Sequence, residues 1–509
     1  MRAEGVGSWT ATMADVRRLL PGLLLAFSAM SASAETLVFS DSFEPLCPGN
    51  GPSVTPGAGG ALLLRGTVVT PATAFAGEVL VVGDTITCAA ATCAAATGAS
   101  TATVVETGGL IFPGLIDTNN FTLFDAFDQD DWTPAQVYAN HNEWPNDPRY
   151  AALVSAKQYL NGEGSPVDYG CELDKYGEIK ALIAGTTSIV SNPGATERAC
   201  YGSLVRNIDR SSNDLGADKV QTATILPTMA SADQVCANFA SDSTDAYLVN
   251  VAEGTNASAR NEFTTLGTAP STDGCLYAPQ TSIVHGTALA DAELTTMANA
   301  GMSLVWTPRS DVALYGATAN VPLARTKGIN LALGANWSIT GSQNLLDELR
   351  YADQVDNTSF GDVLAAKDLV GMATSGAAHA LGLDGVLGTI EAGKKADLTV
   401  IAGSCAAPWA ALRGAAPDDV RLVLVGGVPL YGDTSLQAAA PAVPGCEALD
   451  VCGTPKFVCV AETGGNATNK FGQTLAEIVS TLSTAFAAYD AQNLSQWDFA
   501  PLAPLVRCP

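Results

Sequence analysis

Short apolar runs alternate with amphipathic stretches over the middle of the chain. Strand-like runs occupy residues 188–191, 246–252, 281–285, 303–306 and 329–334, and helix candidates cover residues 289–299 and 344–354. Such alternation is typical of parallel βα units, and about eight of these units fit residues 111–385. The pattern predicts an α/β fold whose main body is a TIM-like (β/α)8 barrel.

The segments beside the predicted barrel carry a different pattern. Before it, strand-like runs separated by Gly and Asp turns lie at residues 61–69, 78–82 and 103–105. After it, similar runs return at residues 398–401 and 420–425. These two segments, residues 61–110 and 386–435, are therefore expected to be rich in β-structure.

The ends of the chain form further regions. Residues 35–60 are expected to be a linker, because Gly and Pro make up more than half of residues 47–60. Residues 436–509 form a Cys-containing tail, in which Leu475, Ile478, Val479, Leu482 and Phe486 follow helical spacing. The spacing predicts an amphipathic helix in the tail.

Residues 1–34 carry the features of a secretory signal peptide. Arg17 and Arg18 precede the apolar run 19–30, and small residues at 32–34 give a cleavage site after Ala34. Met13 is an alternative start, and a buried N-terminal helix is the competing interpretation. The apolar run is too short to span a bilayer. The pattern therefore predicts an exported protein, periplasmic or extracellular, without a membrane span.

The cysteines favour disulfide bonds. All twelve follow residue 34, and an even number in an exported chain is typical of paired cysteines. Cys88 and Cys93 are close enough to close a small loop, and four more crowd the tail: Cys446, Cys452, Cys459 and Cys508. A zinc site is the alternative for the tail, but it has no C-x-x-C pair and no nearby His. The pairing itself is left open.

Charge and composition exclude two classes of protein. The 509 residues include 51 Asp and Glu against 25 Lys and Arg, and the formal net charge is −26. So acidic a chain is a poor partner for nucleic acid. Hydrophobic residues at 47% exclude a disordered chain. Only three residues are His, which restricts any metal chemistry.

Several segments in register resemble one family. They are Ala61-Leu62-Leu63-Leu64-Arg65-Gly66 with Val81-Val82-Gly83-Asp84, Pro113-Gly114-Leu115-Ile116-Asp117-Thr118, Asn336-Trp337-Ser338 with Asn344-Leu345-Leu346-Asp347-Glu348-Leu349, and residues 388–398. Together, over residues 61–435, they resemble the amidohydrolase superfamily, and in particular its cytosine deaminase and imidazolonepropionase-like members. The resemblance implies that residues 61–110 and 386–435 are the two parts of a small β-sandwich domain beside the barrel.

The family's metal site has an unusual counterpart in this sequence. Relatives hold a divalent zinc or iron ion with His-x-His after strand one, His after strand five and Asp after strand eight, and a further His follows strand six. The resemblance places here Asn119, Phe121, Asn250, Asn336 and His285. Amides are poor ligands for zinc or iron, and Asn336 cannot accept a proton at neutral pH. We therefore assign no metal ligand and predict that the inherited mechanism is lost.

The remaining polar residues supply the candidate site. Glu253 matches a proton-shuttling Glu of the family, and with His285 it forms the predicted catalytic pair. An ordinary buried Glu and a hydrogen-bonded His are the alternatives. Asn119, Asn250, Ser310, Asn336 and Trp337 are the predicted substrate-binding residues, and amides suit a small polar molecule.

Four other features have two interpretations each. His141 lies in a loop at the barrel's C-terminal face, as an exposed His or a relocated ligand, whereas His379 is expected on the barrel exterior. Residues 125–131 hold four Asp, which could bind calcium or form a solvated loop that caps a helix at Thr133. Arg206 and Arg309 could grip an anion or form structural salt bridges.

Two functions remain open from the sequence. One is an exported hydrolase of non-peptide C–N bonds that works through Glu253 and His285. The other is a catalytically inactive barrel that binds a small polar ligand or a surface partner. The oligomeric state is left open.

Overall fold

The computed structural model describes residues 51–192, 198–210, 213, 215, 220–441 and 445–508. The predicted signal peptide and most of the predicted linker lie outside these ranges. Within the described part of the chain, no helix has the length and apolar character needed to cross a membrane.

Parallel strands form the centre of the middle region. They are β6 (Leu115–Asp117), β7 (Thr186–Ile189), β8 (Arg206–Asn207), β9 (Val220–Ala223), β10 (Ala246–Val251), β11 (Thr281–His285), β12 (Ser303–Trp306) and β13 (Asn330–Leu333). The first three pair in the order β6-β7-β8, and the other five in the order β13-β12-β11-β10-β9. A parallel bridge between Asn120 and Asn336 connects the ends of β6 and β13. The predicted α/β class is confirmed, and the strand runs at residues 281–285 and 303–306 match in full.

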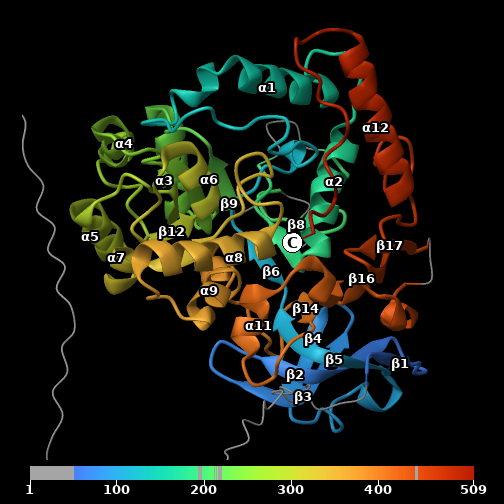
Figure 1. Cartoon of the computed structure of the whole chain (residues 1–509). Coiled ribbons are helices and arrows are strands. Elements are labelled where there is room, and N and C mark those ends of the chain that lie inside the picture. The colour runs from blue at the N-terminus through green and yellow to red at the C-terminus, as the bar shows by residue number, and fades with distance from the viewer. Residues whose placement is uncertain are drawn as a thin grey trace, which may run out of the picture. The chain divides into compact units, whose positions relative to one another are not determined.

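Helices follow most of these strands, as the sequence alternation predicted. They are α1 (Pro148–Leu160), α2 (Gly170–Ile183), α3 (Met229–Ala240), α4 (Ala257–Thr268), α5 (Asp291–Ala300), α6 (Pro308–Tyr315), α7 (Val321–Thr326), α8 (Leu345–Val355), α9 (Ala366–Met372) and α10 (Ser375–Ala380) (Figure 1). Helix α8 shows why the prediction worked. Asn344 caps it by accepting from the Asp347 amide, and Leu345, Leu349 and Ala352 on one face are buried.

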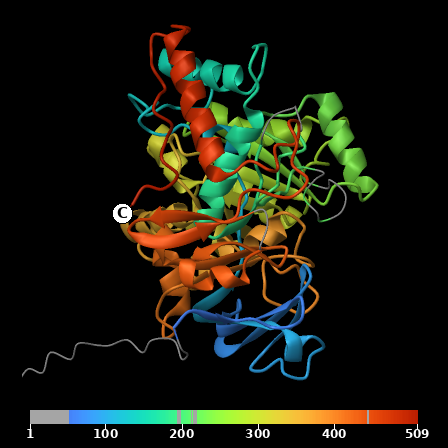
Figure 2. The same ribbon diagram turned by 90° about the vertical axis from the view of Figure 1, so that its right-hand side faces the viewer.

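One ten-stranded sheet contains the β-rich segments from both sides of the parallel strands (Figure 2). The N-terminal strands are β1 (Ser53–Thr55), β2 (Ala61–Val69), β3 (Ala74–Val82), β4 (Thr85–Ala90) and β5 (Thr103–Pro113). The C-terminal strands are β14 (Leu398–Ile401), β15 (Val420–Val425), β16 (Val428–Asp433), β17 (Glu447–Val451) and β18 (Thr454–Val458). The two segments were expected to build one small domain, and their described strands are hydrogen-bonded into one continuous sheet.

Strand β5 makes the sheet continuous. It runs parallel to β2 and also pairs antiparallel with β14 through residues 110–113. Gly108 adopts φ +56° within β5, and the β2 register shifts opposite this position, as at a β-bulge. Leu64, Val105 and Leu398 share one buried core cluster. The two segments of sequence therefore share both hydrogen bonds and a core.

The tail packs against the parallel-strand region. Helix α12 (Leu475–Ala491) starts with a capping box at Thr474, and its apolar face is buried as predicted. The ring of Phe486 lies 4.9 Å from that of Phe127, and Tyr176 donates to the carbonyl of Ala503. The hairpin β17–β18 was not expected in a helical tail. Its backbone pairs with β16 and extends the sheet.

Disulfide bonds within the described residues confirm the prediction of paired cysteines. They join Cys88 to Cys93, Cys171 to Cys200, Cys236 to Cys275, Cys446 to Cys459 and Cys452 to Cys508. The four tail cysteines are thus bonded in pairs, and the zinc alternative for them is wrong.

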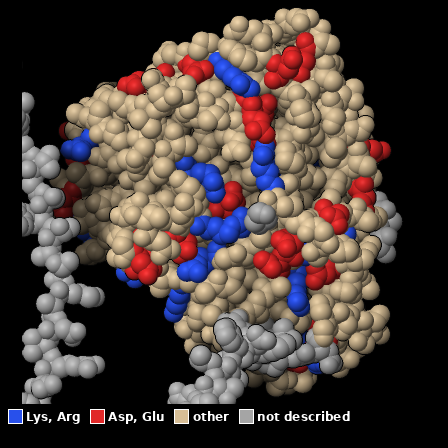
Figure 3. All heavy atoms as spheres, in the orientation of Figure 1, with Lys and Arg blue, Asp and Glu red and all other residues tan. Residues whose placement is uncertain are grey.

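Charged side chains of opposite sign lie side by side on the surface (Figure 3). Asp347, for example, contacts Arg309 at 2.9 Å and Arg350 at 3.2 Å. Arg309 thus forms a structural salt bridge. Arg206 forms a buried one, since it donates to both carboxylate oxygens of Asp397. Neither guanidinium lines the cavity described below, so the anion-gripping alternative for both is not supported.

Candidate functional site

A cavity of about 250 Å³ lies where several parallel strands end. It is lined by five of the predicted site residues: Asn250, Glu253, His285, Asn336 and Trp337. The other two, Asn119 and Ser310, do not line it, but each forms a hydrogen bond with the side chain of Asn336. Residues that are up to 217 positions apart in the sequence thus meet at one site.

The backbone at the strand ends is in an unusual conformation. His285, the last residue of β11, has φ 68°, and Asn336, just after β13, has φ 67°. Ala252 at the end of β10 has φ 59°. Left-handed conformations are uncommon outside Gly, and they cluster where a fold holds functional side chains in place.

Glu253 lines the cavity. One of its carboxylate oxygens accepts a hydrogen bond and the other does not. Tyr315 donates to its Oε1 at 2.6 Å, and the Trp144 indole donates to the Tyr315 hydroxyl at 2.8 Å. Burial and the Glu253 charge raise the pKa of Tyr315, so this hydroxyl stays protonated as a donor. Among the described residues, Oε2 of Glu253 has no hydrogen-bond partner, and the His285 Nε2 lies 3.8 Å from it.

His285 is held between two acids. Its Nδ1 lies 2.9 Å from Asp311 and 2.8 Å from the Thr307 hydroxyl, and Thr318 donates to the second oxygen of Asp311. Burial alone would lower the pKa of His285, but the charges of Glu253 and Asp311 outweigh it and raise the pKa to about 9. The imidazole is therefore a cation at neutral pH.

A chain of neutral hydrogen bonds lies next to this ion cluster. Asn192 donates to Asn119 at 3.3 Å, Asn119 donates to Asn336 at 3.0 Å, and Asn336 donates to Ser310 at 2.7 Å. Thr340 lies 3.0 Å from the Ser310 hydroxyl. The side-chain oxygen and nitrogen of Asn336 are both used by neighbours, whereas the Asn250 amide makes no hydrogen bond among the described residues.

Aromatic rings form much of the cavity wall. Four rings surround Trp337 at centroid distances of 5.5–5.9 Å: Phe121, Phe124, Trp144 and Tyr150. All five residues line the cavity. The tilted and edge-to-face arrangements are the favourable ones for aromatic pairs. The cavity lining therefore combines packed aromatic rings with the ion pair of Glu253 and His285.

His141 also lines the cavity, which corrects the expectation of an exposed loop residue. Its side chain is only 22% exposed, and its Nε2 lies 2.7 Å from Glu262 on α4. The hydrogen bond to Glu262 raises the pKa of His141. By contrast, His379 lies on α10 with its side chain 55% exposed, in contact with Asp384, which agrees with the exterior position expected for it.

The acidic segment at residues 125–131 is structural. Asp125, Asp128 and Asp131 are buried, so the segment is not a solvated loop. Asp125 accepts from Ser338, and Asp128 is paired with Arg507 of the tail. The helix expected at Thr133 does not form, and the next one, α1, begins at Pro148. Residues distant in sequence therefore bind these carboxylates in place of the calcium ion that the sequence suggested.

Sequence reasoning gave no role to several residues of the site. Asp311 orients His285, Glu262 binds His141, and Trp144 and Tyr150 complete the aromatic wall. The position of Asp311 carries a local signal, because it lies in the first turn of a helix that follows strand β12. The loop residues between β6 and α1 carry no such local signal.

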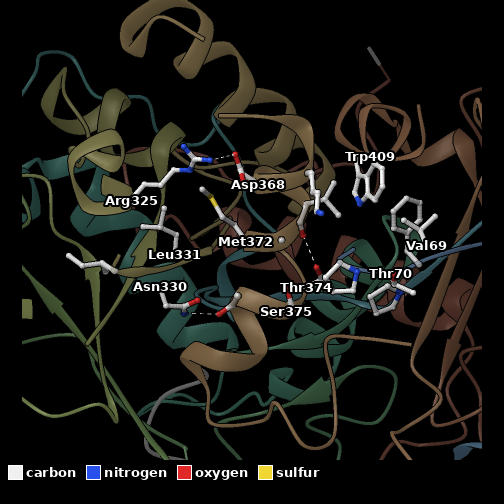
Figure 4. A pocket seen from close by; sticks show the side chains of 18 residues that line it. Val69, Thr70, Arg325, Asn330, Leu331, Asp368, Met372, Thr374, Ser375 and Trp409 are labelled. Carbon is white, nitrogen blue, oxygen red and sulfur yellow. Dashed lines mark hydrogen bonds and ion pairs between the residues drawn. The ribbon is translucent and has the colours of Figure 1, made fainter. Parts of the chain in front are cut away.

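A second cavity, of about 380 Å³, opens near the start of β13 (Figure 4). Leu331, Met372 and Trp409 contribute to its wall, and Arg325 forms an ion pair of 2.8 Å with Asp368 at its margin. None of the predicted site residues lines it. We therefore take the cavity at the strand ends as the candidate functional site.

Sequence comparison places part of the chain among known enzymes. The model of the amidohydrolase family matches residues 236–430. The 5-methylthioadenosine/S-adenosylhomocysteine deaminase of Halobacterium salinarum is 35% identical over 129 residues, and guanine deaminase of Mus musculus is 30% identical over 131 residues. Each match covers 25% of this chain, and 30% and 29% of the respective relative. The chain thus spans less than a third of the length of these curated relatives.

Solved structures show a likeness over more of the chain. An adenosine deaminase from Xanthomonas campestris with bound zinc aligns with a TM-score of 0.54 and 17% identity, over 75% of this chain and 94% of that one. A variant of atrazine chlorohydrolase from Arthrobacter aurescens, complexed with zinc and atraton, aligns with a TM-score of 0.59 and 17% identity, over 75% and 97%. At this identity the likeness shows a shared fold.

Proposed function

We propose that this chain, which belongs to the amidohydrolase superfamily, binds a small organic molecule in the cavity at its strand ends without the family's metal. The relatives include deaminases, which suggests a C–N hydrolase, whereas the polar groups of this cavity suit recognition better than metal-assisted hydrolysis.

The architecture supports a ligand site at this position. The eight described parallel strands follow one another in chain order. The ends of β6 and β13 are joined by a backbone hydrogen bond of 2.8 Å from the Asn336 N–H to the Asn119 carbonyl. We interpret them as a (β/α)8 barrel. In such barrels, functional residues gather at the carboxyl ends of the strands, which is where this cavity lies.

The observation that carries the proposal is the hydrogen-bond chain through Asn119, Asn336 and Ser310. The family would place metal ligands at two of these positions, but here the amides bind each other. The remaining imidazole, His285, has its Nδ1 on Asp311 and is cationic at neutral pH. Amides that are bonded to each other, with a single imidazole beside them, do not fit a zinc or iron site. Nor do the described residues contain a group of three or more His, Cys, Asp or Glu placed to hold a metal ion.

A metal-free hydrolase of non-peptide C–N bonds is the second candidate. Its support is the open Oε2 of Glu253, 3.8 Å from the His285 Nε2. The carboxylate could take a proton from water while the imidazolium donates to a leaving nitrogen. Because the amides of Asn119 and Asn336 bind each other and, among the described residues, no group of metal ligands is placed to activate a water molecule beside this pair, we rank binding first.

Export is part of the proposal. It rests on the signal-peptide pattern of residues 1–34, and the disulfides of the described residues suit an oxidising compartment.

Metal analysis tests the proposal directly. The protein is purified without added metal, incubated with zinc, iron or manganese salts, desalted and analysed for metal content. We expect well below one metal ion per chain. A matched variant restores the family's ligands: Asn119→His, Phe121→His, Asn250→His and Asn336→Asp. This variant should gain metal if the geometry is intact, whereas stoichiometric metal in the unaltered protein would refute the proposal.

Activity assays separate the two candidates. Aminated heterocycles and aryl amides are incubated with the metal-free protein and with Glu253→Gln. Release of ammonia or amine that the substitution abolishes would favour the hydrolase. Saturable binding without turnover would favour the ligand-binding protein.

A further inference from the structure

We propose that the cavity selects an organic cation, a flat amidinium or aryl ammonium compound, over its neutral analogue. The inference rests on the proposed binding function and adds the chemical class of the ligand.

The first observation is the charge around the cavity. Its lining contains one acid, Glu253, and two imidazoles, His141 and His285, and none of the residues described as lining it is Lys or Arg. Glu262 and Asp311 face the two imidazoles from α4 and α6. The cluster therefore holds three acids, Glu253, Glu262 and Asp311, against two imidazoles, and so one acid has no basic counterpart in it.

The second observation is where that charge is accessible. The Glu253 side chain is 7% exposed, and its Oε2 has no hydrogen-bond donor among the described residues. Buried carboxylates are normally paired and hydrogen-bonded. A ligand that brings N–H donors and a positive charge to Oε2 would complete this site, whereas a neutral ligand would leave the extra acid of the cluster without a positive partner.

The third observation is the aromatic part of the cavity lining. Phe121, Trp144, Tyr150 and Trp337 line the same cavity as Glu253. Aromatic faces attract desolvated cations and give a flat ligand a stacking surface. An acidic residue within an aromatic wall therefore recognises both parts of a flat organic cation.

The size of the cavity limits the ligand. A volume of about 250 Å³ equals the share of about eight water molecules in the liquid. One substituted ring fills this space, and Asn250, whose amide is unbonded among the described residues, can accept from a second N–H of the ligand.

Benzamidine and benzamide test the inference as a matched pair, because they share size and shape and only the first is a cation at neutral pH. Binding to the purified protein is measured by calorimetry. We expect benzamidine to bind at least about tenfold more tightly, since a charge-assisted hydrogen bond and a cation–π contact each contribute at this level. Equal affinities, or tighter binding of benzamide, would overturn the charge selection and leave the proposed binding function standing. Absence of binding by both would overturn the two together.

Variants and spectroscopy locate the effect. Glu253→Gln should reduce the preference for benzamidine to within about threefold, whereas Glu163→Gln, an acid paired with Lys157 outside the cavity, should retain it. With only three His in the chain, labelled imidazole rings give a second readout that needs no substitution. Benzamidine should move the signals of His141 and His285 and leave that of His379 unchanged. A response of His379 alone would place the compound elsewhere and refute the site.

Discussion

The ion cluster around His285 permits a quantitative prediction. Replacing Glu253 by Gln keeps the size of the side chain and its ability to accept from Tyr315, and removes one negative charge 3.8 Å from the His285 Nε2. At an effective dielectric constant of about 20, two unit charges at this distance interact by about 4 kcal/mol, or about three pKa units. Water that enters beside the new amide reduces the effect. We therefore expect the pKa of His285 to fall from about 9 to roughly 6 to 7.

Nuclear magnetic resonance of histidine rings measures this pKa directly. The chain has three His, so a ring-labelled sample gives three titration curves, which His141→Gln and His379→Gln assign. The matched control is Glu163→Gln, which removes an acid that is paired with Lys157 on the surface. A His285 that titrates near its ordinary 6.5 in the unaltered protein would show that the two acids do not hold its proton. An unchanged pKa in Glu253→Gln would assign the effect to Asp311 alone.

Three other contacts have measurable consequences. Folding raises the pKa of His285 from 6.5 to about 9. The protonated imidazole therefore stabilises the folded state by about 3 kcal/mol, an effect that is complete below the lower value and disappears as pH rises through the higher one. Urea unfolding should show this pH dependence in the unaltered protein and not in His285→Gln. Phe457→Ala empties a fully buried position in the sheet core and should cost about 3–5 kcal/mol, whereas Leu494→Ala, at a residue that is 55% exposed, should leave the thermal midpoint unchanged. Replacing Cys452 and Cys508 together by Ser opens a loop with a sequence separation of 56, which should cost about 4 kcal/mol and expose the tail to limited proteolysis; equal resistance of both proteins would contradict this.

Local pattern was sufficient for most of the secondary structure. The apolar residues of α8 and α12 repeat at helical spacing, and each helix also has its own cap at Asn344 or Thr474. The run at 61–69 became β2 without a change of bounds. Strand β5 shows the limit, since Gly108 and Gly109 interrupt its apolar pattern, and pairing with β2 and β14 continues the strand past them.

The site was only partly predictable for a physical reason. Glu253, His285 and the amides could be found because the family resemblance aligns them with functional positions, which lie at or near the ends of parallel strands. The partners that set their chemistry are distant in sequence: Tyr315 is 62 residues from Glu253, and Glu262 is 121 residues from His141. The structural role of the acidic segment was unpredictable for the same reason, because Arg507 lies 377 to 379 positions from its Asp partners.

The exchange of Asp for Asn that we infer at position 336 is consistent with the charges that surround it. Asp117 already lies buried at the end of β6, where burial raises its pKa to about 7 although Asn120 and the Ala335 amide donate to it. A second carboxylate close by, with no metal ion to balance it, would add a buried like charge. An amide at 336 avoids that charge and can both accept from Asn119 and donate to Ser310. The amides thus add no charge to the site, and the Oε2 of Glu253 has no hydrogen bond among the described residues, which is the feature on which the proposed cation selection depends.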